Sequence, residues 1–127
     1  MSIFKSLLAV IFLMPGIVFA DTKVFVSFSM PEELLIATLK DCERSKIPVY
    51  LNGMHENSMP KTIQKIMKLT KEVPNLLLQI DPLEFSSYKI EQVPALVLST
   101  NNCFDVIYGN LQISAAISLI REKGGCK

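Results

Sequence analysis

Residues 88–96 read Tyr-Lys-Ile-Glu-Gln-Val-Pro-Ala-Leu, and the apolar run continues to Leu98. A proline can open a β-strand because the ladder needs no N–H from that position. We therefore predict a strand over residues 93–98. A turn at residues 100–103 should then return the chain antiparallel over Phe104 to Tyr108 and complete a hairpin.

Upstream of this hairpin, predicted strands alternate with predicted helices. Short runs rich in β-branched and aromatic residues indicate strands, and apolar residues spaced three or four apart indicate helices. Residues 75–80 are almost continuously apolar, which is typical of a central strand covered on both faces. The order predicts one α/β domain with a mixed central sheet flanked by helices. The other predicted elements are strands at 23–28 and 47–51 and helices at about 32–45, 58–71, 84–88 and 113–122.

Local signals place the helix starts and their apolar sides. Ser29 and Glu32 have the spacing of a capping box before the first helix, and Ser58 opens the second. Asp81 before a proline is typical of a turn or cap residue. The first helix should bury the stripe Leu35, Leu39 and Cys42, and the apolar side of the second consists of Ile63, Ile66, Met67 and Thr70.

Residues 1–20 have the pattern of an export signal. A basic start precedes an apolar core from Leu7 to Met14, then a proline-glycine pair, and Ala20 stands at the cleavage position. The alternative, an uncleaved membrane anchor, is disfavoured because the apolar segment is short and interrupted. We predict a cleaved signal peptide and one exported domain over residues 21–127.

The charge balance of the predicted mature domain narrows the range of functions that the domain could have. Removing 20 of the 127 residues leaves 107, and the loss of Lys5 leaves 12 basic against 12 acidic side chains. A neutral domain is a poor candidate for nucleic-acid binding, which needs a basic face. With a single histidine and no Cys-x-x-Cys spacing, no metal or cofactor site is predicted.

Three cysteines remain in a compartment where thiols can pair. Cys42 lies on the apolar stripe of the first helix and should be buried. Cys103 lies in the predicted hairpin turn, and the last helix runs back toward that turn and ends near Cys126. We therefore predict a Cys103–Cys126 disulfide, which would stabilise the domain by about 3 kcal/mol in the chain-entropy model.

The order of elements is similar to that of the thioredoxin fold, and residues 88–96 resemble its Tyr-x-Ile-x-x-(Ile/Val)-Pro-Thr-Leu stretch. This resemblance implies a cis peptide bond before Pro94. Ser29-Met30-Pro31-Glu32 resembles the thioredoxin segment Cys-Gly-Pro-Cys, with both thiols missing. Dithiol exchange needs an attacking thiolate and a resolving thiol, so this resemblance argues against that activity.

A second resemblance covers residues 24–120 and is carried by three segments. These are Val26 to Leu34, the stretch from Ile80 to Ala95, and Gly109-Asn110. They resemble the F-type conjugative pilin assembly family TrbC. The resemblance implies a periplasmic, non-enzymatic protein of pilus assembly and type IV secretion with a TraW-like partner. The family tends to carry Arg-Gly where this chain has Asn52-Gly53. This chain therefore lacks the arginine that would contact an anion at that position.

Thioredoxin-like domains usually bind extended peptides beside the cis-proline, which leads to a hypothesis for the site. We predict a protein-binding groove without chemistry. Alternatively, the proline only shapes its loop and binding occurs elsewhere. Two other functions stay open, a degenerate thiol-disulfide oxidoreductase that uses one cysteine and a pilin chaperone. The predicted groove residues are Ser29, Met30, Pro31, Val93 and Pro94.

Overall fold

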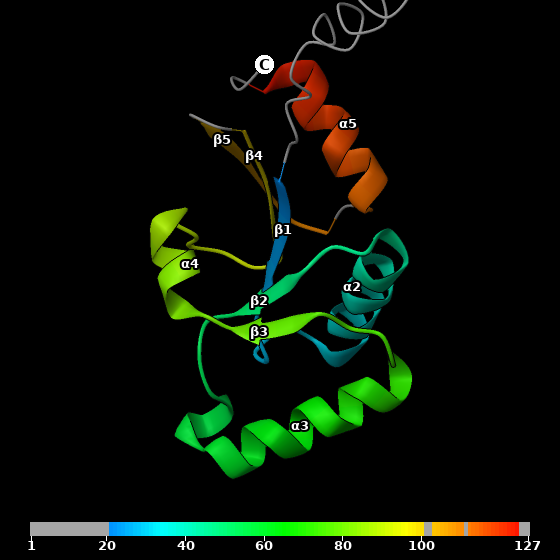
Figure 1. Ribbon diagram of the computed structural model, residues 1–127, viewed down its shortest axis with the longest axis vertical. Coiled ribbons are helices and arrows are strands. Elements are labelled where there is room, and N and C mark those ends of the chain that lie inside the picture. The colour runs from blue at the N-terminus through cyan, green and yellow to red at the C-terminus, as the bar shows by residue number, and fades with distance from the viewer. Residues whose placement is uncertain (1–20, 101–102, 111, 125–127) are drawn as a thin grey trace, which may run out of the picture.

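The computed structural model describes residues 21–100, 103–110 and 112–124. The predicted signal peptide, residues 1–20, lies outside the described residues and stays a prediction. The described strands form one mixed sheet in the order β3-β2-β1-β4-β5 (Figure 1). Neighbours β1, β2 and β3 run parallel, whereas β4 is antiparallel to β1 and to β5. The strands are β1 (Asp21–Val26), β2 (Val49–Leu51), β3 (Leu78–Ile80), β4 (Ala95–Ser99) and β5 (Phe104–Tyr108).

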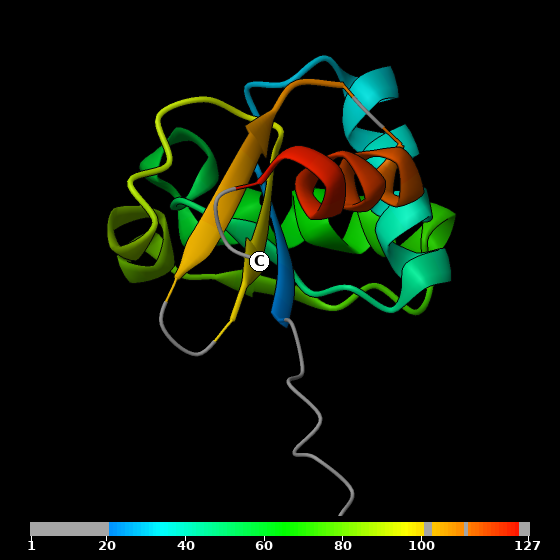
Figure 2. The ribbon, with the colours of Figure 1, turned by 90° about the horizontal axis from the view of Figure 1, so that it is seen from above.

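Helices cover both faces of the sheet, and the predicted α/β fold is confirmed. Helices α2 and α5 lie on one face and α4 lies on the other (Figures 1 and 2). Side chains alternate along β1, so Val24 and Val26 enter the core under α2 and α5, while Phe25 enters the core under α4. The helices are α2 (Glu32–Ser45), α3 (Met59–Glu72), α4 (Pro82–Ser87) and α5 (Ile113–Lys123), with a short 3₁₀ turn η1 (His55–Asn57) before α3.

Strand β3 is an edge strand, so the prediction of a central strand was wrong. It pairs with β2 on one side, and no strand of the described residues pairs with its other side. Leu78 packs partly against the core, but Leu77 and Ile80 are 54% and 37% exposed. A short apolar run specifies a strand without specifying how many neighbours it has.

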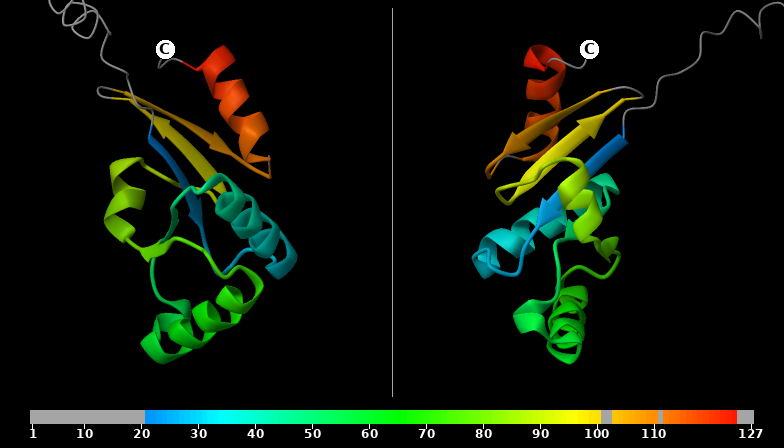
Figure 3. Two further views of the ribbon diagram at one scale, coloured as in Figure 1. Left: turned by 45° about the vertical axis from the view of Figure 1, so that its right-hand side comes forward. Right: turned by 90° about the vertical axis from the view of Figure 1, so that its left-hand side faces the viewer.

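Helix α3 lies beyond the β3 edge of the sheet (Figures 1 and 3). Its buried residues are Thr62 and Leu69, and Leu69 joins the core below α2. Ile63 and Met67, on the predicted apolar side, are instead 49% and 60% exposed. Helix α3 reaches past the last strand of the sheet. The side of the helix that carries Ile63 and Met67 therefore has no sheet face to cover.

The helix starts agree with the sequence predictions in two places and differ in one. Ser58 caps α3 by accepting from the Lys61 N–H, and Asp81 caps α4. The predicted Ser29–Glu32 capping box does not form, because Pro31 occupies the N-cap position of α2 without a side-chain cap.

Helix α5 receives its cap from another helix. Its N-cap residue Gln112 makes no side-chain cap, but Oδ2 of Asp41 on α2 accepts the Ile113 N–H at 2.8 Å. A carboxylate at this position satisfies a free donor and interacts favourably with the helix dipole. Asp41 therefore fixes α5 against α2, which sequence spacing alone does not reveal.

Candidate functional site

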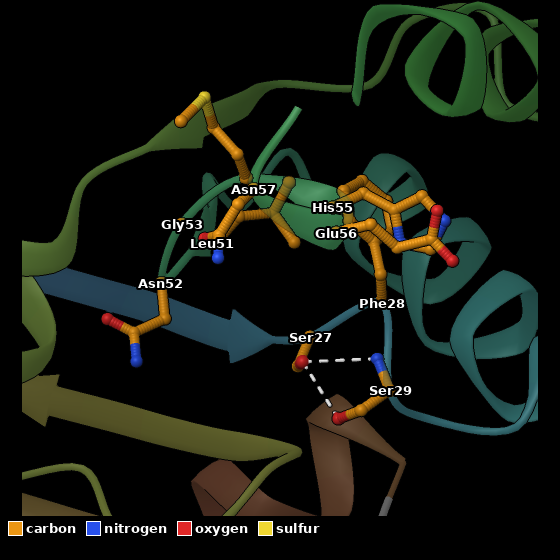
Figure 4. Close-up of a pocket in the computed structure, with 10 residues that line it drawn as sticks. Ser27, Phe28, Ser29, Leu51, Asn52, Gly53, His55, Glu56 and Asn57 are labelled. Carbon is orange, nitrogen blue, oxygen red and sulfur yellow. Dashed lines mark hydrogen bonds between the residues drawn. The ribbon is translucent and has the colours of Figure 1, made fainter. Parts of the chain in front are cut away.

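Two adjoining hollows lie where the parallel strands β1 and β2 end. The larger, called here the His55 pocket, has a volume of about 480 Å³ and is lined by residues 27–29 and 51–57 (Figure 4). The smaller, called here the Val93 groove, has a volume of about 180 Å³. Both are lined by Ser27, Ser29 and Asn52, so we treat them as one cleft. Ligands of α/β folds commonly bind at the carboxyl ends of parallel strands.

Ser27 and Ser29 form the boundary between the two parts of the cleft. Their Oγ atoms lie 2.9 Å apart, within hydrogen-bond distance, and the Ser29 N–H donates to Ser27 Oγ at 3.1 Å (Figure 4). These bonds hold the loop between β1 and α2. Ser29 therefore presents a hydroxyl group where the resemblance to thioredoxin would place the first cysteine of the dithiol, and Ser27 adds a second hydroxyl beside it.

The structure brings some of the predicted groove residues together and separates others. Ser29 and Val93 line the Val93 groove. Met30 is only 7% exposed and belongs to the core below α2, so it supports the loop and does not present a surface to a partner. Pro31 is exposed at the start of α2, outside the residues that line the cleft. Pro94 is buried, and the Val93–Pro94 peptide bond is cis.

Several lining residues were missed by sequence reasoning. Glu91 and Gln92 directly precede Val93, so their place beside it was available from the motif. Asn52 and Phe85 come from other elements, the end of β2 and helix α4, and no local pattern connects them with residue 93. Their contribution depends on how the strands and α4 pack.

A buried threonine anchors the wall of the His55 pocket. Thr62 on α3 is fully buried; its Oγ1 accepts the His55 N–H at 2.8 Å and donates to the Ser58 carbonyl at 2.6 Å. The rings of Phe28 and His55 meet edge to face with centroids 5.5 Å apart. These contacts join α3 to the loop that shapes the pocket.

We expect Thr62→Val to lower the free energy of unfolding by about 1–3 kcal/mol, because the shape is kept but the His55 N–H loses its partner. Urea unfolding followed by circular dichroism measures the change. Thr70→Val on the same helix is the control, since within the described residues Thr70 Oγ1 donates only to the Met67 carbonyl, in an exposed position. An equal loss in both variants would contradict the anchoring role of Thr62.

The opposite wall of the cleft is held by a polar network on the α4 face of the sheet. Lys23 Nζ lies 2.6 Å from Glu84 Oε2 and 3.3 Å from Tyr88 Oη. Burial alone would lower the pKa of Lys23, but the hydrogen bonds to Glu84 and Tyr88 outweigh it and the pKa is raised. The ammonium group is therefore charged at neutral pH and ties β1 to α4, which carries the groove residue Phe85.

No thiol of the described residues lines the cleft. Cys42 is buried on α2, as predicted, and burial, with a smaller contribution from Asp41, raises the pKa of its thiol to about 12. Cys103 is disulfide-bonded. Cys126 lies outside the described residues, so the Cys103–Cys126 pairing stays a prediction. The end of α5 lies close to β5. A Cβ added to Gly124, directly after α5, would come within 2.6 Å of a carboxylate oxygen of Asp105 on β5.

The raised pKa of Cys42 leads to a test at alkaline pH. The folded thiol holds its proton more tightly than the unfolded one, so its stabilising contribution is complete below about pH 8.5 and is lost as the pH rises toward 12. Between pH 8 and pH 10 the wild type should lose about 2 kcal/mol more unfolding free energy than Cys42→Ala. Urea unfolding at both pH values measures this difference, and identical losses would contradict a protonated buried thiol.

Comparison with solved structures defines the class of the domain. The N-terminal domain of PilB from Neisseria gonorrhoeae gives a TM-score of 0.58 at 15% identity, covering 80% of this chain and 75% of that one. The pneumococcal exposed lipoprotein thioredoxin Etrx1 from Streptococcus pneumoniae strain TIGR4 gives 0.58 at 13% identity, covering 82% and 84%. StoA from Bacillus subtilis gives 0.55 at 10% identity, covering 83% and 84%. The domain therefore has a thioredoxin-like fold.

Sequence comparison then gives the family. Residues 24–120 match the type-F conjugative transfer system pilin assembly proteins, and the chain belongs to this TrbC family. The periplasmic protein TrbC of Escherichia coli (strain K12) is 39% identical over 103 residues, which are 81% of this chain and 49% of that protein. The chain thus spans about half the length of this curated relative. Within the described residues, no helix has the length and apolar character needed to cross a bilayer.

Proposed function

We propose that this protein is a non-enzymatic periplasmic component of F-type conjugative pilus assembly and type IV secretion, and that it binds a TraW-like partner through the cleft. Membership of the pilin assembly family supports the process. The relative described as a periplasmic protein supports the compartment, in agreement with the predicted signal peptide.

The observation that carries the proposal is the pair of serine hydroxyls at the centre of the cleft. Thiol-disulfide exchange needs a thiolate that can reach its substrate. Ser27 and Ser29 supply none, and the Cys42 thiol is buried and protonated at neutral pH. This arrangement favours binding over the alternative of a degenerate oxidoreductase.

The lining of the Val93 groove fits an extended segment of another protein. Phe85, Ile90 and Val93 supply an apolar floor, and exposed polar side chains such as Gln92 and Ser29 surround it. Protein interfaces combine these two features, with apolar anchors at the centre and hydrogen-bonding groups at the rim. A segment bound here would place one apolar side chain on the floor and its backbone among the rim groups.

Substitution of an exposed rim residue tests the proposal without disturbing the core. We expect Ser29→Arg to lower both plasmid transfer and co-purification of the TraW-like protein at least tenfold in a strain that lacks the native gene. Ser118→Arg on the exposed side of α5 is the matched control and should leave both unchanged. Gln92→Arg provides a second, independent change in the groove.

Three outcomes would overturn the proposal. Unchanged transfer and partner binding in folded Ser29→Arg and Gln92→Arg variants would exclude the cleft as the binding site. Insulin reduction that disappears in Cys42→Ser would establish the oxidoreductase instead. Co-purification of pilin in place of the TraW-like protein, lost in the same variants, would establish the chaperone.

A further inference from the structure

The outer edge of β3 offers backbone groups to another strand. The Val49 N–H donates to the Leu77 carbonyl, and the Asp81 N–H donates to the Leu51 carbonyl. Successive residues of a strand direct their N–H and C=O groups to opposite sides. The N–H and C=O groups of Leu78 and Ile80 therefore point away from β2, where no strand of the described chain pairs with them. Such an edge is a template for strand addition.

Helix α3, which lies beyond the same edge, presents an exposed apolar stripe. Met59, Ile63 and Met67 are four residues apart along the helix, so their side chains lie on one side. They are 49%, 49% and 60% exposed. We call them the Met67 stripe. Figures 1 and 3 both show α3 at the β3 end of the sheet, beyond its last strand.

The direction of the Met67 stripe follows from an ion pair. Lys68 Nζ lies 3.5 Å from Glu32 Oε1, so the Lys68 side of α3 is directed toward the start of α2. Residues 63 and 67 project from a different side of the helix, about 100° or more away from Lys68. The stripe therefore lies on a part of α3 that α2 does not cover, which agrees with the exposure of its side chains.

The charge of α3 indicates the kind of partner. The helix carries four lysines and one glutamate, although the predicted mature domain is neutral. Lys61 pairs with Glu56 and Lys68 with Glu32. Lys71, four residues after Met67, continues the line of the stripe and makes no ion pair within the described chain. An apolar surface bordered by excess positive charge is complementary to an apolar surface bordered by acidic residues.

We propose that the Met67 stripe and the β3 edge form a second docking surface, separate from the cleft, for an acidic amphipathic segment of another protein. The partner adds a strand to β3 and packs an apolar side against the stripe, with its carboxylates near Lys71. A second copy of this chain fits poorly, because two lysine-rich α3 helices would repel each other. A lipid surface fits poorly, because it cannot pair with the β3 backbone.

Photo-crosslinking from the stripe tests this proposal in cells that carry the complete transfer system. With p-benzoylphenylalanine at position 67, we expect a cross-link to one protein, at a segment with net negative charge and an apolar face. The same group at position 37, on the exposed side of α2, is the control and should not capture that segment. Lys71→Glu should lower the cross-link yield about fivefold, and the equivalent charge change Lys40→Glu should not change it.

A synthetic peptide of the captured segment then serves as the probe in fluorescence anisotropy with the purified chain. Its Kd should rise about tenfold in Ile63→Asp, a loss of about 1.4 kcal/mol. Ile80→Pro should also weaken binding, because it removes an outward N–H while leaving the ladder to β2. Urea unfolding checks that both variants are folded. Ser29→Arg in the cleft should bind the peptide normally. A failure of this proposal can therefore be told apart from a failure of the proposed function.

The other outcomes overturn the proposal. These are no cross-link at position 67, a cross-link to a second copy of this chain, capture of many unrelated proteins, or peptide binding unchanged in Ile63→Asp. Binding to vesicles of phosphatidylethanolamine and phosphatidylglycerol that is lost in Ile63→Asp, without a protein cross-link, would assign the stripe to a lipid surface instead.

Discussion

Phe25→Ala should lower the free energy of unfolding by about 3–5 kcal/mol, which is a large part of the 5–15 kcal/mol typical of a small domain. Phe25 is fully buried on β1, and its ring contacts Tyr50, Phe85 and Tyr88 with centroids 5.4, 4.9 and 5.9 Å apart. Removing it leaves a cavity between the sheet and α4 and removes three aromatic contacts.

Urea unfolding measures this loss, and circular dichroism is the suitable signal because the chain contains no tryptophan. Phe104→Ala is the control of equal size. Phe104 is 42% exposed on β5 and contacts only the Tyr88 ring among the aromatic neighbours of the described chain. Its removal should cost about 1 kcal/mol. Similar losses for the two variants would show that the α4 face of the sheet contributes little to stability.

Leu39→Ala should cost about 2–5 kcal/mol on the opposite face of the sheet. Leu39 is fully buried in the middle of α2, in the core that also contains residues of β1, β4 and α5. Because α5 contacts α2 and is capped from it by Asp41, a cavity at this position should weaken both helices.

Met67→Ala is the contrasting control for Leu39→Ala. The two residues lie at helix positions that periodicity alone treats as equally apolar, but Met67 is 60% exposed. Its substitution should change the unfolding free energy by no more than about 0.5 kcal/mol. A loss comparable with that of Leu39→Ala would place Met67 in the core and contradict the exposed stripe on which the second docking surface depends.

The candidate site was predictable only in part. Ser29 and Val93 were named from two motifs, and both line the cleft. Met30 stands between Ser29 and Pro31 in the same motif but points into the core. A four-residue turn directs neighbouring side chains differently, and the direction depends on the backbone path of the loop. Asn52 and Phe85 complete the site from elements whose positions the motifs do not specify.

The order of helices and strands, the missing dithiol and the family resemblance follow from the sequence by itself, because each depends on residue types and spacing within a short segment. Tertiary structure decided that β3 is an edge strand, that the Met67 stripe is exposed and that the ends of β1 and β2 meet the segment before Pro94. These features depend on which apolar faces cover each other across many residues of chain. Local periodicity specifies that a face is apolar, and only packing determines what covers it.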